Sequence, residues 1–412
     1  MSISPARSAS FDILQKIEKE RAYSSALLPV YEEGLGVKDR ALCHELTLGV
    51  LRRQMYLDKV IGKFVSKKLD LPVKIALRLG LYQILFLDKI PAYPAINESV
   101  NLVQRAKKTS AKGLVNAVLR NAARERPVLE YADETERISV ETSHPRWLIE
   151  KWSVQFGFEA AAAIAGAGNE TGRLEFRETA KSDAALIGRE DLQTLNRLAR
   201  EGKIYFQEKG SQMVAAAVKL EKGQRFLDVC AAPGSKTTYI ANGEAKEDVF
   251  MAAGDLHARR VEVLKQNCVD QGVGFVNIAR YDAERSLPFA GAAFDVALVD
   301  APCSGTGTIR HNPELRYFLD EKDFGELSRK QLRILANASK LIKPGGKLIY
   351  STCSLETEEN EAVCADFMDE RHGFTQISPN VPQKFLTGRG FARTFPHRDD
   401  MDGFFIAVFE KK

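Results

Sequence analysis

Two cysteines stand in turns that would suit reactive groups. Cys303 follows an apolar run that closes on Asp300, and Cys353 follows a second apolar run that closes on Ser351. A cysteine thiolate is a strong nucleophile, but an ordinary thiol has a pKa of about 8.5 and must be activated by its surroundings. One cysteine in such a turn is more often structural than catalytic. Two in matching turns favour a thiol-dependent reaction.

A third stretch, residues 227–238 (LDVCAAPGSKTT), has the composition of a ligand-binding turn. Small residues lie between a predicted strand and a predicted helix, so a ligand could reach the backbone and the free N–H groups of the helix start. The Lys-Thr pair is typical of a P-loop, but Ser235 replaces its glycine, and G-x-G-x-x-G is absent. An ordinary tight turn remains the alternative. The residues predicted to hold a ligand are Cys230, Ala231, Ala232, Pro233, Gly234, Ser235 and Lys236.

Two acidic residues follow the next predicted strands. Asp255 ends the second strand, where a carboxylate typically accepts hydrogen bonds from ribose hydroxyls, and Asp282 follows the third, a suitable place for an adenine amino group. A lone aspartate after a strand is more often a helix cap. Their occurrence at successive strand ends favours ligand binding.

The elements that position these residues alternate between strand and helix. Apolar runs predict strands at 225–230, 249–254, 275–280, 294–300, 347–351 and 404–409, with helices between most of them. This rhythm predicts an α/β domain over 216–412, with a mostly parallel, Rossmann-like sheet covered by helices on both faces. Such sheets bind ligands at the carboxyl ends of their strands, where both cysteines are placed. The acidic run at 356–361 is predicted to open a helix.

The first half of the chain differs. Helical periodicity predicts an all-helical domain over 1–127, with a break at Pro91 and Pro94 before the pattern resumes at Asn97. Residues 128–215 are interpreted as a linker and a small α+β segment, with short strands near 173–177 and 203–206 and a helix over 191–200.

Composition narrows the class of protein. Residues 1–130 hold 22 Lys/Arg and 13 Asp/Glu, while the whole chain has a net charge of only +4, so a basic helical front precedes a slightly acidic body. That asymmetry suggests a polyanion partner, although a solvated helix surface would look the same. Six scattered cysteines predict neither disulfides nor a metal site. Without a membrane-spanning run or signal pattern, we expect a cytoplasmic monomer.

If the ligand of the turn at 227–238 is a methyl donor, a thiol beside it has one clear use. Cytosine C5 is too electron-poor to attack a methyl sulfonium, but addition of a thiolate to C6 makes C5 nucleophilic. Enzymes that methylate amino groups instead tend to carry Asn/Asp-Pro-Pro-aromatic after the fourth strand. Here residues 300–303 read Asp-Ala-Pro-Cys, which argues against an exocyclic nitrogen as the target.

Four segments then carry a resemblance that covers nearly the whole chain. Residues 228–238, 299–314, 350–361 and 402–411 are similar to the motifs of the Sun/Fmu (RsmB-type) 16S ribosomal RNA 5-methylcytosine methyltransferases, of the NOL1/NOP2/Sun group. Residues 1–127 resemble the NusB-like RNA-binding domain at the front of that subgroup. The resemblance implies S-adenosyl-L-methionine as cofactor and small-subunit ribosomal RNA as partner, without metal or membrane.

The resemblance also implies roles. Cys353 would attack the base, and Cys303 would assist release of the methylated product. The turn at 230–236, with Asp255, Asp282 and Asp300, would hold the cofactor, and Asp300 and Lys236 would also touch the target base. The residues that would shape the loop after Cys303 are Arg310, Asn312 and Pro313.

Two departures from the family pattern and two alternatives remain. Ser235 stands where the family has a second glycine, which matters if that position needs a positive φ. The segment 171–215 is shorter than the family's RNA-recognition-like segment. The alternatives are a transfer-RNA cytosine-C5 methyltransferase, and a non-catalytic RNA-binding assembly factor with a vestigial cofactor fold.

Overall fold

The computed structural model describes residues 3–179, 181–182, 192–243, 248–370 and 373–412. The chain divides into two compact units. The first, called here the helical unit, comprises Met1–Thr171 and Ile309–Leu319. The second, the sheet unit, comprises Gly172–Thr308 and Asp320–Lys412. The compact units number two and not three, so the division at residues 127 and 215 stays a prediction.

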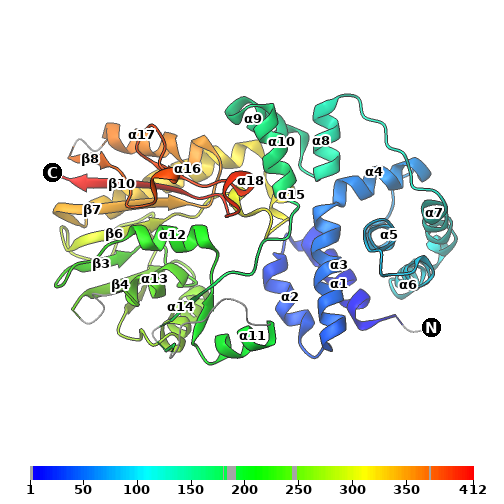
Figure 1. Ribbon diagram of the computed structural model, residues 1–412, viewed down its shortest axis with the longest axis horizontal. Helices are drawn as coiled ribbons and strands as arrows, with labels where there is room; N and C mark the ends of the chain where they lie inside the picture. Colours follow the sequence, from blue (N-terminus) through cyan, green and yellow to red (C-terminus); the bar gives the residue numbers. More distant parts are fainter. Residues whose placement is uncertain (1–2, 180, 183–191, 244–247, 371–372) are drawn as a thin grey trace. The chain divides into compact units, whose positions relative to one another are not determined.

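The helical unit contains only helices among its described residues, as the apolar periodicity predicted (Figure 1). Leu57, Val60 and Ile61, at helical spacing, are buried in its core. Its helices are α1 (Pro5–Glu20), α2 (Ser24–Glu32), α3 (Val37–Arg52), α4 (Gln54–Phe64), α5 (Leu71–Phe86), α6 (Ala92–Arg105), the 3-10 turn η1 (Thr109–Ala111), α7 (Lys112–Arg124), α8 (Glu134–Thr142), α9 (Arg146–Phe156), α10 (Phe158–Ala167) and α15 (Leu315–Phe318).

The predicted restart of a helix at Asn97 is wrong. Helix α6 begins at Ala92, directly after Pro91, and contains Pro94 in its first turn. The N–H groups of a first turn have no acceptor within the helix, so a proline there removes no hydrogen bond.

The segment Ile309–Leu319 contributes buried charges to the helical unit. Arg316 is fully buried and donates to the backbone oxygens of Thr142 (2.7 Å) and Gly168 (2.9 Å) and to Asn169 Oδ1 (2.8 Å). Glu314, also fully buried, accepts hydrogen bonds from the N–H and hydroxyl of Ser24. These bonds tie the segment that follows the Cys303 turn to the helices.

The sheet unit holds an eight-stranded mixed sheet in the order β5-β4-β3-β6-β7-β10-β8, with β9 paired to β10 (Figure 1). Strands β3 to β7 of this order are parallel, and β8, β9 and β10 are antiparallel to their neighbours. The strands are β3 (Arg225–Asp228), β4 (Phe250–Asp255), β5 (Asn277–Arg280), β6 (Phe294–Asp300), β7 (Ile342–Thr352), β8 (Phe374–Ile377), β9 (Ala392–Arg393) and β10 (Phe405–Lys411).

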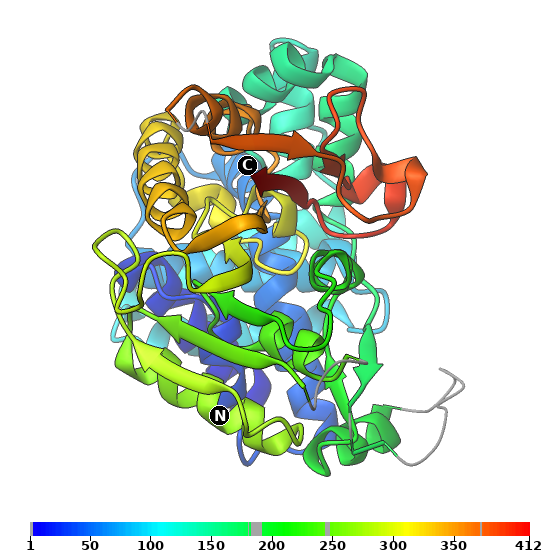
Figure 2. The ribbon, with the colours of Figure 1, turned by 90° about the vertical axis from the view of Figure 1, so that its left-hand side faces the viewer.

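Helices cover both faces of this sheet. Side chains alternate along each strand, so Phe226 packs toward one face and Leu227 toward the other. In Figure 2, α16 and α17 lie on one side of the sheet and α12 on the other. The helices of the unit are α11 (Leu192–Arg200), α12 (Lys209–Ala217), α13 (Ser235–Ala241), α14 (Ala258–Asp270), α16 (Glu321–Ser339), α17 (Glu361–Glu370) and α18 (Pro396–Asp399).

Most predicted strands of the sheet are present, with three differences. Strand β7 begins at Ile342 and not at Lys347 as predicted, because residues 343–346 form an irregularity inside the strand: Phe294 pairs with Ile342, and Val296 already pairs with Lys347. Strands β8 and β9 were not predicted; they are short edge elements without a clear apolar alternation.

The predicted α+β segment is only partly described. A two-stranded antiparallel sheet joins β1 (Phe176–Glu178) and β2 (Ile204–Phe206), and α11 packs on it. Helix α11 begins at Leu192, and Asp191, the predicted start of that helix, lies outside the described residues.

Candidate active site

The two cysteine turns meet at one edge of the sheet. Strands β6 and β7 are parallel neighbours in which Asp300 pairs with Ser351, so both turns leave the sheet at the same end. The sulfur atoms of Cys303 and Cys353 lie 3.2 Å apart and form a hydrogen bond. The strand order reverses beside β3 and β6, the position where such sheets bind ligands.

A buried carboxylate positions the Cys303 turn. Glu359 lies in the 3-10 turn η3 (Thr357–Glu359) and accepts hydrogen bonds from the backbone N–H (2.9 Å) and the hydroxyl (2.8 Å) of Ser304. The Ser304 hydroxyl also contacts that of Ser354 at 3.0 Å, which joins the two turns. Burial raises the pKa of Glu359, and the bonds from Ser304 oppose this effect. The acidic run was interpreted only as a helix start, so this function of Glu359 was missed.

Two glycines allow the backbone of three segments to meet. The N–H of Gly307 donates to the Cys353 carbonyl (2.9 Å), and the N–H of Gly403 donates to the Gly307 carbonyl (2.8 Å). A Cβ atom on Gly307 would lie 2.1 Å from the Gly403 carbonyl oxygen. Residue 307 must therefore be glycine, although its φ is not in the left-handed region. Sequence reasoning missed this requirement because it arises from a contact between distant segments.

A lysine–aspartate pair lies beside the cysteines. Lys236 Nζ is 2.7 Å from Asp300 Oδ2, and the Ser351 hydroxyl donates to Asp300 Oδ1 at 2.7 Å. Burial by itself would lower the pKa of Lys236, but the Asp300 carboxylate outweighs it and the pKa is raised. The negative charge of a Cys353 thiolate also raises it. Lys236 is therefore a buried cation close to Cys353.

The environment of Cys303 favours the protonated form of its thiol. The hydrogen bond with Cys353 and then burial raise the pKa of Cys303 well above that of an ordinary thiol. Cys303 thus keeps its proton and can donate it to the Cys353 sulfur.

The turn after β3 adopts a conformation that depends on glycine. Gly234 has a φ of +105°, and a Cβ atom there would lie 2.7 Å from a Leu264 methyl carbon. Ser235 begins α13 and is not among the described non-glycine residues with positive φ. The departure at Ser235 therefore introduces no backbone strain.

Acidic side chains converge on this turn. Asp255 is buried and accepts a hydrogen bond from the Ala232 N–H (3.3 Å), whereas Asp282 accepts one from the Glu284 N–H (3.0 Å) and so closes its own turn. Asp228, at the end of β3, is buried; Oδ2 accepts from the Thr237 hydroxyl, while Oδ1 has no hydrogen-bond partner among the described residues. Asp228 was not predicted to be a site residue, although its position at the end of a strand indicated that it could be one.

The residues after Cys303 divide between the units. Thr308 ends the sheet-unit part, and Arg310, Asn312 and Pro313 belong to the segment grouped with the helical unit. The Arg310 carbonyl accepts a hydrogen bond from Arg52 there. These three residues and the two cysteines therefore belong to different compact units.

The fold and the site together define a class of protein: a NusB-like helical domain is followed along the chain by a Rossmann-like methyltransferase domain. The model of the family "16S rRNA methyltransferase RsmB/F" matches residues 215–410, and that of the NusB family matches residues 4–124. Probable ribosomal RNA small subunit methyltransferase B of Bacillus subtilis (strain 168) is 31% identical and covers 100% of both chains. Ribosomal RNA small subunit methyltransferase B of Erwinia tasmaniensis is 30% identical and covers 97% of each chain. The chain belongs to this family of small-subunit ribosomal RNA methyltransferases.

Solved structures agree with this fold. The crystal structure of PH0851 superimposes with a TM-score of 0.83 at 25% identity and covers 100% of both chains. The structure of NSun6 from Pyrococcus horikoshii with SFG has a TM-score of 0.56 at 21% identity, over 65% of this chain and 98% of that one. The described helices include none long and apolar enough to cross a membrane.

Proposed function

We propose that this protein forms 5-methylcytosine in small-subunit ribosomal RNA through a covalent bond between Cys353 and cytosine C6, with S-adenosyl-L-methionine as methyl donor. One observation carries the proposal: the Cys303 and Cys353 sulfurs lie 3.2 Å apart at the ends of adjacent strands, beside the Lys236–Asp300 pair. A structural pair of cysteines would need no buried cation next to it.

The turn after β3 fits the cofactor. S-adenosyl-L-methionine presents an ammonium, two ribose hydroxyls and an adenine amino group, and all of these donate hydrogen bonds. The site offers carboxylate acceptors in Asp228, Asp255 and Asp282, and Asp228 Oδ1 is buried and without a partner among the described residues. When bound, the cofactor supplies an electrophilic methyl group on a sulfonium. A structural neighbour of the same fold holds SFG, an analogue of this cofactor.

Cys353 starts the reaction as a nucleophile. Its thiolate adds to cytosine C6, and the electron pair of the C5–C6 bond moves to C5. Lys236 and Asp300 also present a donor and an acceptor to the polar edge of the base. C5 then takes the methyl group, and the bond between that group and sulfur breaks with its electron pair left on the sulfur. Loss of the C5 proton to a base re-forms the C5–C6 double bond and expels the Cys353 thiolate.

Cys303 assists the last step. Its raised pKa keeps a proton on its sulfur, which lies within hydrogen-bonding distance of Cys353. A hydrogen bond from this thiol stabilises the departing thiolate of Cys353, so its removal slows release of the methylated product.

Two variants and one sequencing experiment test the proposal. Bisulfite sequencing of RNA from cells with and without the protein should show one or more cytosines in small-subunit ribosomal RNA that lose protection; loss of protection only in transfer RNA would refute the proposed substrate. Cys353→Ala should abolish methyl transfer while binding the cofactor as the parent does. Cys303→Ala should accumulate a covalent protein–RNA adduct that denaturing gels detect, and the double variant should not.

A further inference from the structure

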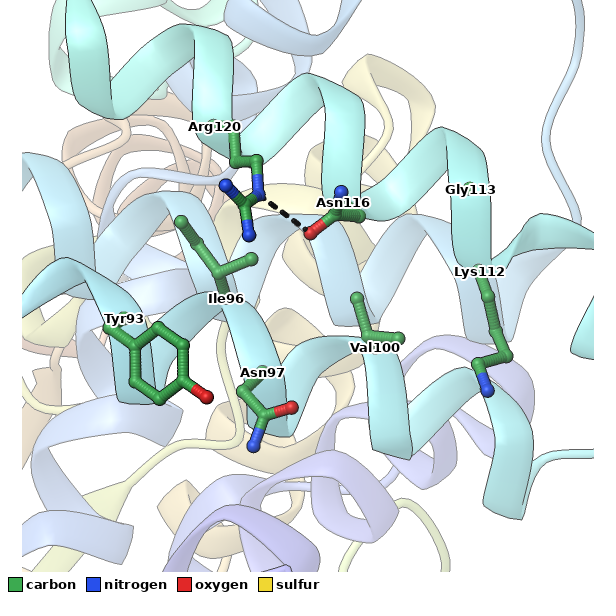
Figure 3. A pocket seen from close by; sticks show the side chains of 8 residues that line it. All are labelled: Tyr93, Ile96, Asn97, Val100, Lys112, Gly113, Asn116 and Arg120. Atoms are coloured by element: carbon green, nitrogen blue, oxygen red, sulfur yellow. Dashed lines mark hydrogen bonds between the residues drawn. The ribbon is translucent and has the colours of Figure 1, made fainter.

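A pocket of about 530 Å³ lies between α6 and α7 of the helical unit. The lining residues of α6 have the i, i+3, i+4 and i+7 spacing that brings residues to the same side of a helix, and those of α7 lie at i, i+1, i+4 and i+8. Figure 3 shows Ile96 and Val100 of α6 directed toward α7, which carries Asn116 and Arg120. The lining residues are Tyr93, Ile96, Asn97 and Val100 from α6, and Lys112, Gly113, Asn116 and Arg120 from α7.

The lining combines an aromatic ring, apolar side chains and amides. Ile96 is buried and Val100 half-buried, and between them they form an apolar floor. Asn97 and Asn116 place carboxamides, each able to donate and accept, on opposite helices. Tyr93 is 73% exposed, so its ring is open to a planar ligand. A planar group with donors and acceptors on its edge fits this arrangement.

The charge of the pocket favours an anion. Residues 92–124 hold six basic side chains and a single acidic one, Glu98, which accepts hydrogen bonds from Ser4. In the described part of the chain, Arg120 donates to the side-chain oxygen of Asn116 (3.0 Å) and Lys112 to that of Gln104 (3.1 Å). Amide partners leave the positive charges of Arg120 and Lys112 uncompensated.

We propose that this pocket binds one unpaired nucleotide of the RNA substrate. The base stacks on Tyr93 and meets the two carboxamides, and the flanking phosphates contact Lys112 and Arg120. Single-stranded nucleotides are recognised by this combination of an aromatic platform, amide contacts and basic side chains. The inference rests on the proposed function, because the nucleotide belongs to the RNA that the sheet unit methylates.

Two glycines offer a matched pair of variants. A Cβ atom on Gly113 would meet nothing within 4 Å, and the same is true of Gly62 in α4. Leucine at either position raises helix propensity, but only at Gly113 does the side chain stand beside the pocket. Gly113→Leu should therefore fold like the parent and weaken RNA binding, whereas Gly62→Leu should bind RNA as the parent does.

The experiment measures binding of the full-length protein to a transcript of small-subunit ribosomal RNA, together with kcat and KM for methyl transfer. Tyr93→Ala should raise Kd and KM roughly 5- to 100-fold, the effect expected for loss of one stacked base, with kcat unchanged. Arg120→Gln should reduce the slope of log Kd against log salt by about 0.7 to 0.9, as expected for one lost phosphate contact.

Several results would overturn the pocket assignment. The assignment is wrong if the Kd for RNA is the same as that of the parent in Tyr93→Ala, Arg120→Gln and Gly113→Leu. It is also wrong if these variants lower kcat and leave Kd and KM unchanged. If the variants bound assembled small-subunit particles more weakly than the parent does, but bound naked RNA as the parent does, the pocket would instead be assigned to a protein partner. The proposed function fails separately, if the parent protein methylates no cytosine in RNA that it binds.

Discussion

Replacing Asp228 by asparagine should remove a pH-dependent penalty from the sheet unit. The carboxyl is buried at the end of β3, and burial raises its pKa from the ordinary value of 3.8 to about 7, against the opposing hydrogen bond from Thr237. The difference is about three pKa units at about 1.4 kcal/mol each, so the ionised form costs on the order of 4 kcal/mol of folding free energy above neutral pH.

The sign follows from proton binding. Between pH 3.8 and about 7 the folded state holds more protons at Asp228 than the unfolded state does, so stability falls as pH rises through this window. Asparagine cannot ionise and loses this slope. It keeps an acceptor for Thr237 but brings an N–H₂ group that lacks a partner, which costs about 1–3 kcal/mol at every pH. The variant should thus be less stable than the parent near pH 4.5 and more stable near pH 8.

Urea unfolding of the cofactor-free protein at intervals between pH 4.5 and 8.5 measures the effect, and hydrogen exchange of the β3 amides places it in the sheet unit. Asp295→Asn is the matched control. Its carboxylate is held by Lys343, which lowers the pKa despite partial burial, so this variant should lose stability at neutral pH. A difference between Asp228→Asn and parent that does not change with pH would refute the reasoning.

The same variant tests the cofactor site: Asp228→Asn should weaken S-adenosyl-L-methionine binding roughly 10- to 100-fold in calorimetry, the loss expected for one charged hydrogen bond, and unchanged affinity would exclude Asp228 as a ligand. Gly307→Ala should abolish methyl transfer, because its Cβ atom would lie 2.1 Å from the Gly403 oxygen, whereas Gly274→Ala, which meets nothing within 4 Å, should keep parental activity. Equal activity of these two would contradict the close backbone contact. Arg316→Met should destabilise the helical unit by about 3–5 kcal/mol, since it removes three hydrogen bonds at about 1–1.5 kcal/mol each, and thermal unfolding would show little change if these bonds were dispensable.

Much of the fold could be predicted from local pattern. The helical period over the first 127 residues and the apolar runs of the catalytic half correspond to α1–α7 and to most strands of the sheet. Short edge strands such as β8 were not predicted, because four residues with mixed burial carry little periodic signal. The start of α6 was misplaced because proline was treated as a helix breaker, although a first turn tolerates it.

The sequence by itself determined which residues end which strands, and therefore that Cys303, Cys353 and Asp300 would share one edge of a parallel sheet. It could not determine what holds them there. The bonds from Ser304 to Glu359 and the backbone contact of Gly307 with Gly403 join segments that are about 50 to 100 residues apart. Only tertiary structure decides such contacts, because they depend on strand order and on the close approach of loops, and neither leaves a periodic trace in the chain.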